Sequence, residues 1–253
     1  MLRIGDQTLA PTLVVFDKDG TLIAFDDMWH AWYDRLLISL NTRLSLTPET
    51  RIGLAGALGY DVASGVWDPQ GPLTLAATPE VELLVASQLY CHLGLTWDEA
   101  LEQVKMAAAE ARAELFRADL LKPLGDIAGL LAAMRSAGLK VALATADTRL
   151  PTQHALDALA IEALFDTVVC GDDGFALKPA PDMGLEVCRR LGVSPQEALM
   201  IGDTTSDLQM ARRAGFGWAV AVTTGASQAQ DLAPLADQVI AGLHEIEVLL
   251  NHA

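Results

Sequence analysis

Two hydrophobic patterns divide this chain, and each predicts a different type of element. Short, nearly continuous apolar runs are typical of strands buried on both faces of a parallel sheet. Such runs predict strands at 12–17, 139–145, 166–170, 198–201, 218–222 and 238–240. The intervening stretches predict helices at 124–136, from about 151 onward, and at 181–191, 206–214 and 243–251. This alternation predicts an α/β fold with a Rossmann-like, doubly wound parallel sheet that helices cover on both faces.

Residues 24–121 carry a different pattern, which predicts a mostly helical segment. An apolar stripe recurs there at helical spacing, formed by Trp29, Trp32, Tyr33, Leu36, Leu37 and Leu40. Helix-start signals with Thr at the capping position follow at Thr47-Pro48-Glu49, Thr78-Pro79-Glu80 and Thr96-Trp97-Asp98-Glu99. We expect the last of these helices to run to about Leu121, and the Gly- and Pro-rich stretch 59–75 to be an irregular or hairpin-like excursion.

The position of the helical segment predicts the domain organisation. It lies between the first strand and the rest of the α/β pattern, so it is an insertion rather than an appended domain. We therefore expect a core domain formed by residues 1–23 and 122–253, and an inserted helical domain at 24–121. The aromatic stripe of the insertion is better explained by packing than by a substrate pocket.

Composition and charge narrow the possible partners. The chain has 253 residues, of which 17 are basic and 33 are acidic, giving a formal net charge of −16. This charge disfavours nucleic acid and anionic membranes as partners. The three cysteines have no metal-ligand spacing and suit a reducing compartment. The sequence has no signal-peptide pattern and no long apolar run, so we expect a cytoplasmic protein.

Polar residues follow several of the predicted strands. Asp17 and Asp19 follow the first strand, Thr145 ends the second, and Asp203 follows the strand at 198–201; Asp207 and Lys178 lie in adjoining segments. The carboxyl ends of parallel strands meet at one edge of a sheet, where ligands bind. Carboxylates suit a hard cation such as Mg²⁺, and a lysine with a hydroxyl suits phosphate oxygens. The set predicts phosphoryl-transfer chemistry.

The same residues resemble a known family. In chain order, Asp17-Lys18-Asp19-Gly20-Thr21, Thr145, Lys178-Pro179 and Gly202-Asp203-Thr204-Thr205-Ser206-Asp207 resemble the four motifs of the haloacid dehalogenase superfamily. The branch similar to phosphoglycolate phosphatase matches best, and the insertion at 24–121 stands where that branch carries a helical cap of the C1 type. The resemblance covers the whole α/β pattern.

The resemblance implies roles for the four acids. Asp17 would be the nucleophile that forms an aspartyl-phosphate. Asp19 would protonate the leaving oxygen and then take a proton from the attacking water. Mg²⁺ would be held by the Asp17 carboxylate, the Asp19 backbone carbonyl and Asp203. Asp207 would support these ligands or reach the metal through water.

The resemblance also implies a phosphate site and marks two departures from the family pattern. Thr145 and Lys178 would hold phosphoryl oxygens, and Gly20 would let the backbone approach the ligand. Lys18 stands where relatives often carry an apolar residue, and we expect it to serve local packing. Asp147 stands where relatives often carry a small or amide residue.

The leading hypothesis is a Mg²⁺-dependent phosphatase that hydrolyses a small phosphorylated metabolite through an aspartyl-phosphate, acting as a monomer or homodimer. One alternative is a phosphomutase similar to β-phosphoglucomutase, which shares the first chemical steps. Another is a non-catalytic module that binds phosphate or a protein partner on the same fold. A halide-releasing enzyme is disfavoured, because its relatives lack an acid at the position of Asp19.

Overall fold

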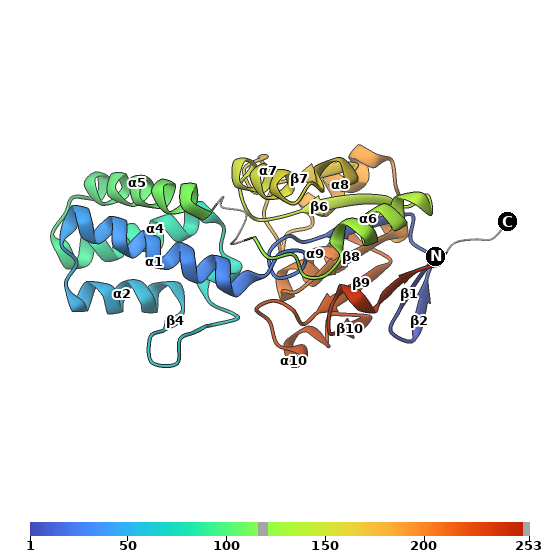
Figure 1. Cartoon of the computed structure of the whole chain (residues 1–253), viewed down its shortest axis with the longest axis horizontal. Helices are drawn as coiled ribbons and strands as arrows, with labels where there is room; N and C mark the ends of the chain where they lie inside the picture. Colours follow the sequence, from blue (N-terminus) through green and yellow to red (C-terminus); the bar gives the residue numbers. More distant parts are fainter. Residues whose placement is uncertain (116–120, 250–253) are drawn as a thin grey trace. The chain divides into compact units, whose positions relative to one another are not determined.

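The protein was analysed as a computed structural model, which describes residues 1–115 and 121–249. The chain divides into two compact units (Figure 1). Met1–Phe25 and Leu121–Ala253 form an α/β unit, and Asp26–Leu120 form a helical unit. In the described residues, no helix has both the length and the apolar character needed to span a membrane.

A parallel sheet forms the centre of the α/β unit. Its strands are β3 (Leu13–Phe16), β6 (Lys140–Ala144), β7 (Thr167–Val169), β8 (Ala198–Gly202), β9 (Trp218–Val222) and β10 (Gln238–Ile240). Their spatial order is β10-β9-β8-β3-β6-β7, and every neighbouring pair is parallel. The order reverses at β3, as it does in doubly wound sheets. The predicted fold class is confirmed.

The central strands are buried on both faces, which explains their continuous apolar sequences. Leu13 and Val15 of β3 pack in a cluster that includes Met183 and Met210, which lie on two of the flanking helices. The alternate residues Val14 and Phe16 face the other way and are also fully buried. The sequence of β3 thus fits a central strand that is buried on both of its faces.

Helices follow the strands, as the pattern predicts (Figure 1). They are α6 (Ile127–Ser136), α7 (Arg149–Ala158), α8 (Asp182–Leu191), α9 (Thr205–Ala214) and the short α10 (Ala229–Leu232). Single 3₁₀ turns lie at Glu162–Leu164, Pro195–Glu197 and Leu243–Glu245.

The prediction of a helix at 243–251 is wrong over the described residues. After the 3₁₀ turn, Ile246–Val248 form strand β11. It pairs antiparallel with β1 (Leu2–Ile4), which also pairs with β2 (Gln7–Leu9) in a small separate sheet. Pairing with the distant β1 satisfies the backbone of this segment, and residues 250–251 lie outside the described residues.

The inserted unit is mostly helical, as predicted. Its elements are α1 (Phe25–Leu44), α2 (Pro48–Leu58), α3 (Pro72–Leu75), α4 (Thr78–Leu93) and α5 (Trp97–Leu115), with a two-stranded excursion of β4 (Tyr60–Asp61) and β5 (Val66–Trp67). Thr47 caps α2 as expected. The N-cap of α4 is Ala77 rather than Thr78, and Glu80 accepts a hydrogen bond from the Ala77 amide. The predicted continuation of α5 beyond Leu115 falls mainly outside the described residues.

Candidate active site

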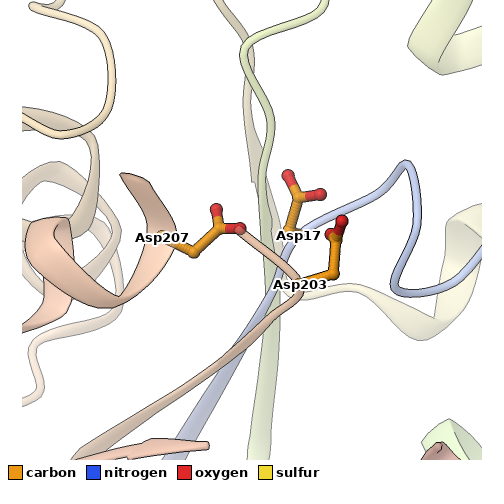
Figure 2. Close-up of side chains that lie close together, drawn as sticks. All are labelled: Asp17, Asp203 and Asp207. Atoms are coloured by element: carbon orange, nitrogen blue, oxygen red, sulfur yellow. The ribbon is translucent and has the colours of Figure 1, made fainter. Parts of the chain in front are cut away.

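Three aspartates meet at the carboxyl edge of the parallel sheet. Asp17 follows β3 directly and Asp203 follows β8, which pairs with β3 in parallel. Asp207 lies in the first turn of α9. Each of the three offers a carboxylate oxygen, and these oxygens all lie within 4.8 Å of one another (Figure 2). All three residues are buried, so this set of hard oxygen donors fits a divalent cation such as Mg²⁺ or Ca²⁺.

Lys178 joins two of these acids. Its Nζ atom donates to Oδ1 of Asp17 and to Oδ1 of Asp207, each at 2.5 Å, and to the Ala144 carbonyl oxygen at 3.0 Å. The carbonyl belongs to the last residue of β6, beside β3. Burial lowers the pKa of Lys178, but the Asp17 and Asp207 carboxylates outweigh burial and raise the pKa above its ordinary value. The lysine therefore places a fixed positive charge against the Asp17 carboxylate.

Asp203 is held from two sides. Thr21 Oγ1 donates to its Oδ1 at 3.0 Å, and the Ala226 amide donates to its Oδ2 at 3.1 Å. Two glycines make room for it. A Cβ on Gly20, whose φ is +81°, would lie 2.3 Å from Asp203 Oδ2, and a Cβ on Gly225 would lie 1.9 Å from the same atom. These two hydrogen bonds and the close approach of two glycines fix the position of the Asp203 carboxylate.

The segment after β9 is a part of the site that the sequence reasoning missed. It contains Gly225 and Ala226, and Thr224 Oγ1 donates to the Gly20 carbonyl oxygen at 2.7 Å. A Thr-Thr-Gly sequence directly after a predicted strand is the signal that could have found it, because that position again lies at the carboxyl edge of the sheet.

Asp207 has a second, structural role. Its Oδ2 accepts hydrogen bonds from the Thr204 amide at 3.1 Å and from Thr204 Oγ1 at 2.6 Å, and the two residues form the capping box of α9. Its Oδ1 is the partner of Lys178. The start of α9 therefore holds Asp207 rigidly at the edge of the acid cluster.

Asp19 lies apart from this cluster and has a different partner. Both of its carboxylate oxygens lie 2.8 Å from Nζ of Lys18. Lys18 is buried, and its Nζ also lies 3.1 Å from Oδ2 of Asp147. The expectation that Lys18 serves packing misses this ion pair.

Thr145 directly follows β6, which ends one residue before the predicted strand does. It is buried, its amide donates to the Val169 carbonyl oxygen at 3.0 Å, and its Oγ1 accepts a hydrogen bond from the Asp147 amide at 3.2 Å. The hydroxyl proton of Thr145 can still be donated to an oxygen of a ligand.

Burial is the main cause of the raised pKa values of Asp17, Asp203 and Asp19. Burial raises the pKa of Asp17, the Lys178 ammonium opposes the rise, and the Asp207 charge adds to it. Burial and then the neighbouring charges of Asp17 and Asp207 raise the pKa of Asp203 well above its ordinary value. Burial also raises the pKa of Asp19, against the opposing effect of Lys18. Several carboxylates in one buried cluster repel, and a bound cation relieves that repulsion.

The aromatic stripe of the helical unit packs as predicted. Trp32 and Tyr33 are buried. The Tyr33 ring centroid lies 5.3 Å from that of Tyr60 and 5.4 Å from that of Trp67, and the latter two rings are 4.5 Å apart. The stripe therefore anchors the β4–β5 excursion on α1.

Comparison with known proteins places these observations in a family. Residues 11–215 match the model of the haloacid dehalogenase-like hydrolases. The chain is 31% identical over 209 residues to a phosphoglycolate phosphatase of Shigella boydii, covering 80% of this chain and 77% of that protein. It is 35% identical over 241 residues to the "Probable phosphatase IndB" of Dickeya dadantii, covering 95% of this chain and 94% of that protein.

Solved structures show the same fold. A haloacid dehalogenase phosphatase from Thermococcus onnurineus superposes with a TM-score of 0.65 at 24% identity, over 92% of this chain and 95% of that one. The residues matched by the family model include the acid cluster, Lys178 and both segments that follow β3 and β8. The chain therefore belongs to the haloacid dehalogenase-like hydrolases, on the branch similar to phosphoglycolate phosphatase, as its sequence predicts.

Proposed function

We propose that this enzyme is a Mg²⁺-dependent phosphatase that hydrolyses a small phosphorylated metabolite through an aspartyl-phosphate on Asp17. The observation that carries the proposal is the position of Asp17 at the end of the central strand, 2.5 Å from Lys178 and within the cluster formed with Asp203 and Asp207. The phosphatase names of its relatives support the reaction class.

In the first step, an oxygen of Asp17 bonds to phosphorus and the bond from phosphorus to the leaving oxygen breaks. Asp19, protonated at that moment, gives its proton to the leaving oxygen, and the alcohol departs. In the second step, Asp19 takes a proton from water, the water oxygen bonds to phosphorus, and the Asp17–phosphate bond breaks. The raised pKa of Asp19 favours the protonated form that the first step requires.

The remaining residues of the site bind and orient the phosphoryl group. Lys178 and Thr145 would contact its oxygens, and the backbone at Gly20 would approach it closely. Asp17, Asp203 and the Asp19 carbonyl would hold Mg²⁺, with Asp207 supporting them. When bound, Mg²⁺ supplies positive charge that offsets the charge of the phosphoryl group and of this acidic site.

The same proposal covers the role of the inserted unit, the cellular location of the protein and its oligomeric state. Residues 24–121 would form the C1-type cap that selects the substrate, and residues 1–23 and 122–253 would form the catalytic core. A cap that closes over the site excludes water and bulky ligands, which favours a small metabolite. The net charge and the cysteine usage support a cytoplasmic protein that binds neither nucleic acid nor membrane. The proposal leaves the oligomeric state as a monomer or homodimer.

The test is phosphate release from p-nitrophenyl phosphate and from a panel of phosphorylated metabolites, with Mg²⁺ and with EDTA. We expect Mg²⁺-dependent turnover that Asp17→Asn abolishes. Asp157→Asn, the same change at an exposed site of the α/β unit, serves as the matched control and should leave the rate unchanged. No turnover across the panel would contradict the enzyme proposal, and phosphate transfer within a sugar phosphate with little net release would indicate a mutase.

A further inference from the structure

Lys18 is a buried lysine at the carboxyl edge of the sheet, where a charged side chain is unusual. Its side chain is only 2% exposed, and its Nζ lies within hydrogen-bond distance of both oxygens of Asp19 and 3.1 Å from Asp147. Burying an ammonium group is costly, and an apolar side chain of similar volume often packs equally well without that cost. Packing therefore does not explain why a lysine stands here.

The contacts of Asp147 show how the ammonium is held. Oδ1 of Asp147 accepts a hydrogen bond from the Thr148 amide at 2.8 Å, and the Asp147 amide donates to Thr145 Oγ1 at 3.2 Å. These bonds tie Asp147 to the segment between β6 and α7. Its Oδ2 is then directed to Lys18, so that the ammonium is fixed between two carboxylates.

The arrangement forms a chain of contacts that ends at Asp19. It runs from the Thr148 amide through Asp147 to Lys18, and from Lys18 to both oxygens of Asp19. Two contacts to one carboxylate restrict its rotation more than a single hydrogen bond does. Burial lowers the pKa of Lys18, but Asp19 and then Asp147 raise it above its ordinary value, so the lysine stays charged.

We propose that Lys18 and Asp147 are positioning residues that hold the Asp19 carboxyl group where it meets the leaving oxygen of the substrate. The proposal rests on the proposed function, in which the Asp19 proton passes to the leaving oxygen as the phosphorus–oxygen bond breaks. It also gives the acid at 147 a role, because Asp147 balances the buried charge of Lys18.

The proposal makes a prediction that depends on the leaving group. An alkoxide is a poor leaving group and needs the proton from Asp19, whereas p-nitrophenolate leaves without it. A misplaced Asp19 therefore slows formation of the aspartyl-phosphate from an alkyl phosphate more than from an aryl phosphate. The ratio kcat/KM reports this step, whereas kcat also includes the hydrolysis of the intermediate, in which Asp19 acts on every substrate.

The experiment compares kcat/KM for p-nitrophenyl phosphate and for the best alkyl phosphate of the panel. Lys18→Met should lower kcat/KM for the alkyl ester about tenfold more than for the aryl ester, a part of the 10²–10⁴ that general acid catalysis supplies. Asp147→Ala should show the same selectivity with a smaller loss. Lys140→Met, at the exposed amino end of the neighbouring strand β6, is the matched control and should change neither value.

A double-variant cycle separates positioning from a general loss of structure. In the Asp19→Asn background, Lys18→Met should cause no further selective loss, because the group that it positions is gone. If Lys18→Met does not fold, Asp147→Ala in both backgrounds provides the same comparison. Equal losses on the two esters, or no loss, would overturn the proposal. A wild-type enzyme without Mg²⁺-dependent turnover would instead contradict the proposed function.

Discussion

Lys178 and Asp17 form a buried ion pair, with Nζ of the lysine 2.5 Å from Oδ1 of the aspartate. The two residues are 161 positions apart in the sequence, and the lysine also contacts Asp207 at 2.5 Å. One positive charge therefore stabilises two buried carboxylates. In the proposed reaction, the same charge would face the phosphoryl group as it reaches Asp17.

Lys178 should contribute to the stability of the fold as well as to catalysis. Lys178→Met leaves Asp17 and Asp207 buried without their cation, and we expect the free energy of unfolding to fall by about 3–5 kcal/mol. The loss should be larger at about pH 8 than at about pH 5.5, because protonation relieves the unpaired carboxylates. Chemical denaturation at both pH values, without metal, measures it.

Lys178→Arg is the matched variant for this prediction. It keeps the charge, so most of the stability should remain, but the planar guanidinium cannot reproduce the contacts of a single ammonium. Turnover should fall at least about tenfold in this variant. Wild-type stability in Lys178→Met would show that the ion pair does not stabilise the fold.

Asp17→Asn and Asp19→Asn should give different substrate profiles. Asp17→Asn removes the nucleophile, and turnover of every ester should disappear. Asp19→Asn removes the proton donor, so kcat/KM for alkyl phosphates should fall about 10²–10⁴-fold while aryl phosphates lose less. Steady-state kinetics on both ester classes measures the difference, with circular dichroism to verify folding. Hydrolysis of alkyl phosphates by Asp19→Asn at the wild-type rate would refute this division of roles.

Gly225→Ala tests the packing around Asp203. The new Cβ would lie 1.9 Å from Asp203 Oδ2, so either the carboxylate or the loop after β9 must move. Loss of metal affinity by about tenfold or more is expected, as for other disrupted supports of metal ligands. Isothermal titration with Mg²⁺ measures the affinity.

Gly56→Ala provides the control for that substitution. Gly56 lies in the helix α2, where a Cβ would meet no heavy atom within 4 Å. Alanine should leave metal affinity unchanged and stabilise the helix by about 0.5–1 kcal/mol. Unchanged Mg²⁺ affinity in Gly225→Ala would show that Asp203 tolerates the displacement or does not bind the metal.

The sequence was sufficient to predict the core of the fold, because the relevant signals are local. Each central strand has a continuous apolar run, and a polar residue such as Asp17 or Asp203 follows it directly. Parallel strands bring such residues together whatever their separation in the chain. That single rule is enough to place Asp17 near Asp203, although 185 residues lie between them in the sequence.

The features that escaped prediction depend on distant partners. Ile246 and Val248 are β-branched and favour a strand, but the apolar residues around them are also compatible with a helix, and the pairing with β1 selects the strand. Lys18 resembles a packing residue until Asp147, from the other side of the insertion, is placed beside it. No local pattern reports such a pair, since each residue by itself is compatible with a solvated loop.

Metal binding should be linked to pH in a defined direction. Burial raises the pKa of Asp17 from its ordinary 3.8 to about 7, with Lys178 opposing the rise and Asp207 adding to it, and burial raises the pKa of Asp203 as well. A carboxyl group with a raised pKa in the folded state stabilises the metal-free fold fully below its ordinary pKa. That contribution is lost as the pH rises through about 7.

Mg²⁺ requires the deprotonated carboxylates, so its affinity should rise over the same pH range. We therefore expect saturating Mg²⁺ to raise Tm more at about pH 8 than at about pH 5.5, where protons compete for the ligands. At about 100 times Kd the stabilisation at the higher pH should be about 2.7 kcal/mol. Differential scanning calorimetry with Mg²⁺ and with EDTA measures both values.

Asp203→Asn should remove the effect of Mg²⁺ on Tm, and Asp157→Asn should retain it. This comparison separates binding at the site from the general attraction of a cation to a chain of charge −16. A rise in Tm that is the same at both pH values would show that these carboxylates are not the ligands.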